Sequence, residues 1–314
     1  MEPSMTSIVA VLAQLALVMA AGVVYLRRAR VDRPPIGVFN RNDVFIVAAV
    51  LVIVPVVYLR LPTVVLAMVF ALLSFGMLYF AMTPLVRSRR AAGIAIALIG
   101  SDIALAQVAR DSHPWLFNGV NNVALAVMLV GVCNMWVQSG VRARHIAWLG
   151  SGIAVYDVAA TFGVPMMGEL VDRLSSLPLT PMLVWGEGAA AVGVGLGDLL
   201  LILLWTLVAE KAFSPRAGIA AAALGLSCSF SLFLAFWLDL VNRPLPAMVV
   251  LGPAMAIHYR LLVGKAKRER TMGEYLDSLE SEPRMAPIGT HWLHGSRLSE
   301  ASRARPAATS NDAA

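Results

Sequence analysis

The sequence predicts an all-α protein that crosses a membrane several times. Of its 314 residues, 59% are hydrophobic and only 14% are charged, and the mean hydropathy is +0.74. A soluble domain of this length does not need so much apolar surface. The apolar residues also fall into long runs separated by short, mostly basic segments. This arrangement is typical of a polytopic membrane protein.

Nine apolar runs are long enough, or nearly long enough, to cross a bilayer as helices. A spanning helix needs about 20 residues, and about 17 to 25 are tolerated. Basic residues follow the first run and none precedes it, so we expect a retained span and no cleaved signal peptide. We therefore expect a nine-helix transmembrane domain over residues 1–264. Its runs cover residues 5–26, 44–59, 63–86, 91–109, 121–139, 147–164, 183–209, 217–240 and 245–264.

The composition changes after residue 264. Residues 265–314 are rich in Arg, Ser, Glu, Ala and Pro and contain few large apolar residues. Such a segment buries too little apolar surface to fold, so we expect a disordered cytoplasmic tail. It begins with basic residues suited to anionic lipid headgroups, namely Lys265, Lys267, Arg268 and Arg270.

The distribution of Lys and Arg between the loops predicts the orientation in the membrane. Short cytoplasmic loops carry an excess of these residues. Twelve of them lie in the first, third, fifth and seventh loops, against four in the N-terminal segment and the even-numbered loops. We therefore expect the N-terminus outside and the C-terminus in the cytoplasm. The net charge of +6 arises largely from these loops and the tail, and it does not indicate nucleic-acid binding.

Two carboxylates inside the apolar runs are the candidate catalytic groups. A charge near mid-bilayer costs several kcal/mol and is tolerated mainly where function or a partner compensates for it. Asp157 lies ten residues from the expected cytoplasmic boundary of the sixth run, or about 15 Å at the helical rise. Asp198 lies twelve residues from that of the seventh, or about 18 Å. Two consecutive antiparallel helices thus carry acids at nearly the same depth.

Such a pair of acids suits hydrolysis of a peptide bond. Two carboxyl groups in a low dielectric do not both ionise readily, so one keeps its proton while the other acts as a base. That combination can activate water and protonate a leaving amine. Glycines precede the second acid in Gly195-Leu196-Gly197-Asp198. They let a neighbouring helix or an extended peptide approach closely, and tight helix packing is the alternative explanation for them.

Three short motifs, in their order and placement, resemble the presenilin and signal peptide peptidase family. Members of this family are nine-span intramembrane aspartyl proteases with a YD motif, a GxGD motif and a PAL motif before the ninth span. Tyr156-Asp157 stands in the sixth run and the GxGD sequence ends at Asp198 in the seventh. Pro246-Ala247-Met248 stands where PAL is expected, and Met248 departs from its leucine.

The resemblance implies an intramembrane aspartic endopeptidase with Asp157 and Asp198 as its catalytic dyad and no metal or organic cofactor. Transmembrane peptides are the implied substrates, and the lipid bilayer is the other expected partner. The short loop after the sixth run and the outside N-terminus are nearer to signal peptide peptidase, which implies substrates of type II orientation, including remnant signal peptides. In a prokaryote the protein would lie in the cell membrane. The residues implied to bind substrate or shape the site are Tyr156, Gly195, Leu196, Gly197, Pro246, Ala247 and Met248.

Two other functions use intramembrane carboxylates. A proton-coupled transporter could employ Asp102 of the fourth run with Asp157 and Asp198 as a relay, but the inverted repeats typical of such proteins are not evident in the sequence. A prepilin-peptidase-like enzyme shares the GxGD chemistry, but it would need larger cytoplasmic loops than this chain has. Asp102 could hydrogen-bond locally through Ser101, face a water-filled cavity or belong to a different proton pathway, and we favour a structural role.

Overall fold

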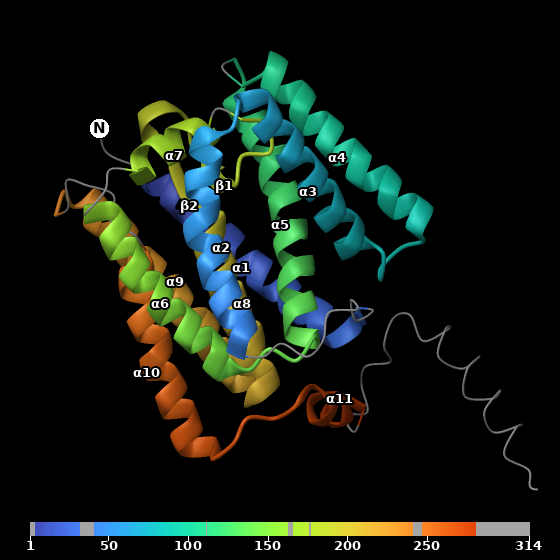
Figure 1. Ribbon diagram of the computed structural model, residues 1–314, viewed down its shortest axis with the longest axis vertical. Coiled ribbons are helices and arrows are strands. Elements are labelled where there is room, and N and C mark those ends of the chain that lie inside the picture. The colour runs from blue at the N-terminus through green and yellow to red at the C-terminus, as the bar shows by residue number, and fades with distance from the viewer. Residues whose placement is uncertain are drawn as a thin grey trace, which may run out of the picture.

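The computed structural model describes residues 4–31, 41–110, 112–162, 166–175, 177–240 and 247–280. Within these ranges the chain forms eleven α-helices, a short 3-10 helix and a two-stranded β-hairpin. Figure 1 shows α3, α4 and α5 together on one side of the bundle and α6, α9 and α10 on the other. The predicted helical class is confirmed, with the hairpin as an addition to it.

Eight of the nine apolar runs each correspond to one helix. Proline starts two of these helices, in the first turn, where a missing backbone N–H is not needed. In one of the two, the side chain of Ser214 also caps the first turn by accepting from the N–H of Ala217. The helices are α1 (Met5–Arg28), α2 (Arg41–Arg60), α3 (Thr63–Met82), α4 (Ser88–Val108), α5 (Pro114–Gln138), α6 (Ala143–Phe162), α9 (Pro215–Trp237) and α10 (Met248–Ala266).

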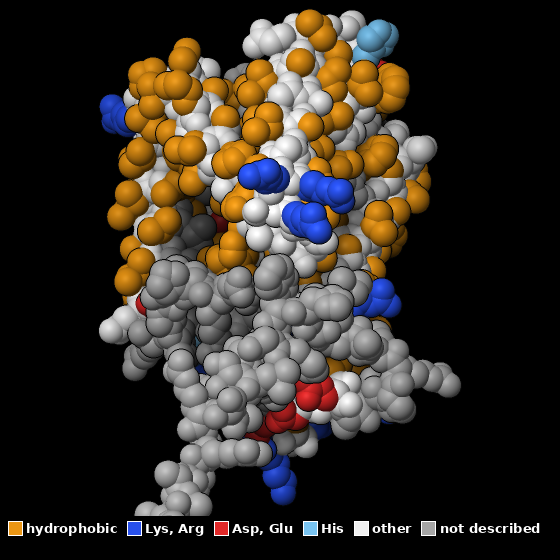
Figure 2. Space-filling model, turned by 90° about the vertical axis from the view of Figure 1, so that its right-hand side faces the viewer, with side chains coloured by type: hydrophobic (Ala, Val, Ile, Leu, Met, Phe, Trp, Pro, Cys, Tyr) orange, Lys and Arg blue, Asp and Glu red, His pale blue; other side chains and the backbone are white. Residues whose placement is uncertain are grey.

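The outer surface of the bundle is apolar. Large hydrophobic side chains such as Leu72, Val108 and Ile219 are exposed, and they cover much of the described surface in Figure 2. A soluble monomer rarely exposes so extensive an apolar surface. Among the described residues, α1, α3, α4, α5 and α9 are long and apolar enough to cross a membrane. These features identify a membrane-embedded protein.

The seventh apolar run, expected as a single helix over residues 183–209, is not one. Its first part forms β1 (Met182–Trp185), the 3-10 helix η1 (Gly188–Ala190) and β2 (Val192–Gly195). Helix α8 begins only at Leu196 and ends at Ala212. Gly186 and Gly188 adopt φ angles of +94° and +54°, which are incompatible with a continuing right-handed helix. The prediction was wrong because apolar content alone does not distinguish a strand from a helix.

Helix α8 occupies the centre of the bundle. All of its residues from Leu201 to Ala212 are buried, and α1, α5, α6 and α9 pack around it. A helix that is apolar on every side is expected in such a position. The core therefore fixes the helix whose first turn carries Asp198.

Two further helices lie outside the nine runs, namely α7 (Met166–Ser175) and α11 (Met272–Glu280). α11 corrects the expectation of disorder throughout residues 265–314, of which residues 281–314 lie outside the described part of the chain. A capping box explains the start of α11, because Thr271 and Glu274 each accept a hydrogen bond from the other's backbone N–H. Met272 and Tyr275 are buried against the bundle.

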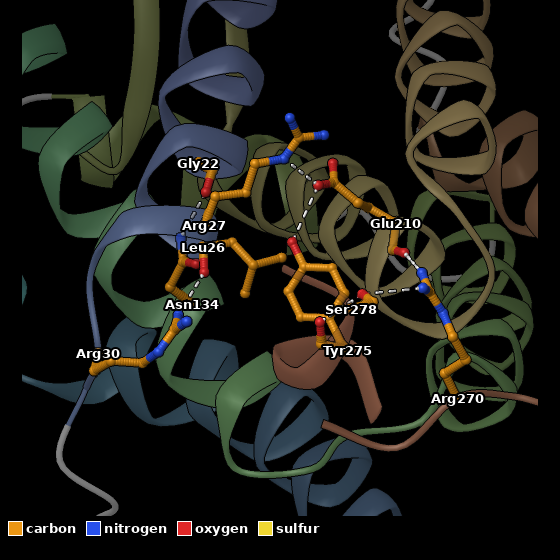
Figure 3. Close-up of polar contacts among 9 residues, drawn as sticks. All are labelled: Gly22, Leu26, Arg27, Arg30, Asn134, Glu210, Arg270, Tyr275 and Ser278. Carbon is orange, nitrogen blue, oxygen red and sulfur yellow. Dashed lines mark hydrogen bonds and ion pairs between the residues drawn. The ribbon is translucent and has the colours of Figure 1, made fainter. Parts of the chain in front are cut away.

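A polar cluster attaches α11 to the end of α8 (Figure 3). The carboxylate of buried Glu210 accepts from Nε of Arg27 at 2.7 Å and from the hydroxyl of Tyr275 at 3.2 Å. Arg270 donates to the backbone oxygen of Glu210 at 2.9 Å. Burial raises the pKa of Tyr275, and the neighbouring Glu210 raises it further, so the phenol stays protonated and donates.

We expect Tyr275→Phe to loosen α11 without unfolding the bundle. The change removes one hydrogen bond to a charged acceptor, which is worth about 1.5–3 kcal/mol, while Glu210 keeps its contact with Arg27. Hydrogen exchange of the α11 amides should therefore become faster, whereas that of the α8 amides should not. Asp277→Asn, a change at an exposed position of the same helix, is the control. Equal protection of α11 in all three proteins would contradict a role for this contact.

Candidate functional site

The structure brings the two predicted catalytic acids together. α6 packs against α8; Asp157 lies five residues before the end of α6, and Asp198 is the third residue of α8. Both side chains are half-buried. The two acids therefore lie on neighbouring helices, near the end of α6 and at the start of α8. Asp198 is thus in a first helical turn, and not in the middle of a continuous helix as expected.

A β-hairpin leads directly into Asp198. β1 and β2 pair antiparallel, with Val184 opposite Gly193 and Met182 opposite Gly195. One face of the hairpin is buried through Leu183, Val192 and Val194. Leu196, the first residue of α8, continues the pairing, because its N–H donates to the oxygen of Pro181 at 2.9 Å. The catalytic candidate is therefore connected to a short sheet.

The outer edge of β1 is occupied by side chains of α5. Asn122 accepts from the N–H of Val184 at 3.0 Å and donates to its oxygen at 2.8 Å. Asn121 donates to the oxygens of Met182 and Thr180 at 3.1 and 3.0 Å. Consecutive residues of a strand direct their peptide groups to opposite edges, so residues two apart share an edge. The peptide groups of Met182 and Val184 therefore point away from β2.

It follows that Gly193 directs its N–H and C=O, and Gly195 its N–H, to the outer edge of β2. In the antiparallel register they lie opposite Val184 and Met182, and residues directly opposite share the same orientation relative to the ladder. Gly195 is the N-cap of α8, so its C=O accepts the first bond of that helix and is not part of the open edge. β2 thus presents an open edge formed by two residues without side chains.

Space around the GxGD glycines is consistent with approach of a peptide. Gly195 caps the N-terminus of α8, and a Cβ added there would lie 3.9 Å from Oδ2 of Asp198. A Cβ added at Gly197 would meet no described atom within 4 Å. Tight helix packing therefore does not explain these two glycines within the described part of the chain. Leu196 between them is half-buried and packs against the core.

Tyr156 is half-buried beside Asp157 and lies within electrostatic range of its carboxyl group. Its hydroxyl is buried and has no hydrogen-bond partner among the described atoms. A buried hydroxyl of this kind usually has a partner. Tyr156 can therefore offer a hydrogen bond to a molecule that enters the site.

The structure describes two of the three residues of the third motif, Pro246-Ala247-Met248. Pro246 lies outside the described residues, Ala247 is the half-buried N-cap of α10, and Met248 is buried. α10 crosses α6 closely, because a Cβ added at Gly252 would lie 2.5 Å from the backbone oxygen of Gly150. The helices are antiparallel, so Ala247 and Met248 lie on the side of this crossing that faces Asp157.

Asp102 of α4 is fully buried and holds the segment that precedes β1. Its Oδ1 accepts from the N–H of Leu179 at 2.6 Å, and Leu179 has a φ of +55°. Arg110 is its charged neighbour and donates to the oxygens of Ser175 and Leu177 in the same segment. These contacts support the structural role that we favoured for Asp102.

We expect Asp102→Asn to retain most of the activity proposed below, within about threefold. The amide oxygen can still accept from Leu179, so the segment before β1 keeps its hydrogen bond. Asp102→Leu has a similar volume but no acceptor, and it should lower stability by about 1–3 kcal/mol because the N–H of Leu179 is left unsatisfied. Thermal unfolding and peptide cleavage are the measurements. Loss of cleavage in folded Asp102→Asn would favour a three-acid relay instead.

No model of a known protein family matches the sequence, and no curated protein matches it. Among the described residues, no group of three or more His, Cys, Asp and Glu side chains could hold a metal ion.

Sequence reasoning missed Asn121 and Asn122. A signal was present, because two adjacent amides begin the fifth apolar run, and polar side chains at membrane depth need partners. Their partners are backbone groups of β1, a strand that the sequence did not predict. The two asparagines could not be assigned a role without that strand.

Proposed function

We propose that this protein is an intramembrane aspartyl protease that hydrolyses peptide bonds of transmembrane helices. The observation that carries the proposal is that Asp157, near the end of α6, and Asp198, at the start of α8, lie on helices that pack against each other. The open edge of β2, which runs into Asp198, adds a place for an extended peptide. The apolar outer surface supports action on substrates within the bilayer.

The chemistry needs one carboxylate and one carboxylic acid. The carboxylate takes a proton from water as the water oxygen attacks the scissile carbonyl carbon, and the acid donates its proton to the developing oxyanion. The tetrahedral intermediate then collapses, a proton is delivered to the amide nitrogen, and the C–N bond breaks. Asp157 and Asp198 exchange these roles during the cycle, and the pair titrates as a unit.

A transmembrane helix must unwind locally before it can react, because its carbonyl groups are engaged in helical hydrogen bonds. The unwound segment can add a strand to an exposed sheet edge, a common mode of peptide recognition. Gly193 offers its N–H and C=O and Gly195 its N–H for this pairing, and their lack of side chains permits close approach. A peptide paired there continues toward Asp198, since α8 follows β2 directly.

The proposed topology has nine spans, formed by α1 to α6 and α8 to α10, with the N-terminus outside. α8 has 17 residues, which is at the lower limit for a span, and the preceding hairpin supplies the rest of the crossing. Non-helical backbone at membrane depth is tolerated where protein satisfies its polar groups, as Asn121 and Asn122 do for β1. This topology makes α11 cytoplasmic.

The direct test is to incubate the purified protein with a panel of helical membrane peptides and to identify products by mass spectrometry. Asp198→Ala, prepared in the same way, is the control for contaminating proteases. We expect internal cleavage within the hydrophobic segment by the wild type only. Cleavage of no peptide in the panel, or equal cleavage by both proteins, would refute the proposal.

We expect Gly193→Pro to lower cleavage by at least about tenfold, whereas Gly193→Ala should have a much smaller effect. Proline removes the N–H that points to the open edge and leaves the ladder with β1 intact, as tolerated on edge strands. Alanine keeps the N–H, and its Cβ would lie 3.1 Å from the flexible end of Met182. Steady-state cleavage and thermal unfolding should be measured together. Equal activity of the two folded variants would contradict pairing at β2.

A further inference from the structure

We propose that Asn122, assisted by Asn121, is a positioning residue that takes the place of a third strand beside β1. In this role it sets the angle at which β2 approaches Asp198 and thereby the peptide bond that is cleaved. This inference rests on the proposed protease function. It assigns a role to a region of α5 that contributes no residue to the three motifs.

The contacts of Asn122 reproduce those of a neighbouring strand. In an antiparallel sheet, a hydrogen-bonded residue pair exchanges one N–H···O bond in each direction. The amide group of Asn122 makes the same exchange with Val184, accepting at 3.0 Å and donating at 2.8 Å. Asn121 extends the contact along the same edge to Met182. Both asparagines are at most 4% exposed, so water does not replace these bonds.

Closing the edge of β1 leaves β2 as the edge at which an extended peptide can pair. A strand edge presents a row of unpaired backbone groups and accepts further strands. An open β1 edge would compete for the same peptide and hold it one strand away from Asp198. Adjacent strands are about 4.8 Å apart, which is enough to prevent reaction. The asparagines therefore direct the substrate to the productive edge.

The second consequence concerns the orientation of the hairpin. β2 joins α8 at Gly195, and a glycine by itself restricts the angle between strand and helix least. The far strand, β1, is held by Asn121 and Asn122 of α5, and α5 itself packs against α8. The amides thus fix the hairpin against the helix that carries Asp198. A small tilt would matter, because neighbouring residues of an extended peptide are only about 3.3 Å apart.

The test compares the cleavage positions produced by the wild type, Asn122→Ala and Asn118→Ala on one membrane peptide. Asn118 lies one turn earlier on α5 and makes none of these contacts, so it is the matched control. We expect Asn122→Ala to spread cleavage over neighbouring peptide bonds and to lower kcat/KM by about tenfold, mainly through KM. A change that lowered only the amount of folded enzyme would leave the cleavage positions unchanged.

Asn122→Asp provides a second, reversible test that does not depend on the folding of Asn122→Ala. A protonated carboxyl group can accept from the N–H of Val184 and donate to its oxygen, whereas a carboxylate can only accept. The variant should therefore cleave at the wild-type position at low pH and at several positions at high pH. The wild type should keep one pattern at every pH at which it is active.

The possible outcomes are distinct. Wild-type positions in both folded Asn122 variants at every pH would overturn the role of Asn122 and leave the protease proposal intact. Cleavage of no peptide by the wild type would overturn the protease proposal and this one with it. A pH-dependent pattern in Asn122→Asp alone supports the role of Asn122, including when Asn122→Ala fails to fold.

Discussion

Replacement of either Asp157 or Asp198 by asparagine is expected to abolish peptide cleavage while the helical bundle stays folded. Asparagine keeps the shape of the side chain but cannot exchange a proton with water or with the leaving amine. Loss of general acid–base catalysis alone costs about 10²–10⁴-fold, and in the proposed mechanism each acid takes part in both halves of the reaction. Alanine at either position should be equally inactive.

The measurement is product formation by mass spectrometry, with circular dichroism and thermal unfolding to show that each variant is folded. Asp277→Asn, which changes an exposed acid on α11, is the matched control and should keep full activity. Substantial cleavage by folded Asp157→Asn or Asp198→Asn would exclude the dyad mechanism. If an asparagine variant loses both its activity and its fold, the alanine variant at the same position is compared with the wild type instead. Alanine leaves no buried polar amide without a partner.

The second large effect is expected for the orientation of the substrate. We expect type II membrane peptides, with the N-terminus in the cytoplasm, to be cleaved at least about tenfold faster than type I peptides. Such a ratio needs only about 1.4 kcal/mol of difference between the two transition states. The physical reason is that the proposed pairing with β2 is directional, because a peptide in the opposite direction would present its carbonyl groups differently to Asp157 and Asp198.

One helical sequence should be expressed in both orientations, with flanking lysines that determine each orientation, and cleavage should be compared in cells. Labelling of tags at the two ends of the enzyme would independently determine its own topology. Asp198→Ala with both substrates provides the background. If the N-terminus of the enzyme is outside and the type I peptide is cleaved as fast as the type II peptide, substrate orientation is not recognised.

Hydrophobic patterning was sufficient to predict a helical membrane protein and the positions of eight helices. Apolar runs of about 20 residues can satisfy their backbone only within themselves when they face lipid, so each becomes a helix almost independently of its neighbours. The same reasoning singled out Asp157 and Asp198, since an ionisable group in an apolar run stands out without any knowledge of the fold. Resemblance to a known family added Tyr156 and the motif Pro246-Ala247-Met248, of which only Pro246 lies outside the described residues.

The hairpin before α8 could not be predicted from local sequence, because tertiary contacts stabilise it. Residues 183–195 are as apolar as a helix would be, and their strand conformation is stabilised by bonds from Asn121 and Asn122, about 60 residues earlier in the chain. Likewise, Asp102 finds its partner at Leu179 and α11 is attached through Glu210. Periodicity reports only which side chains of one segment face the same way, whereas these contacts join segments far apart in sequence. The open edge beside Asp198 therefore follows from the packing of α5 on the hairpin, which no local pattern encodes.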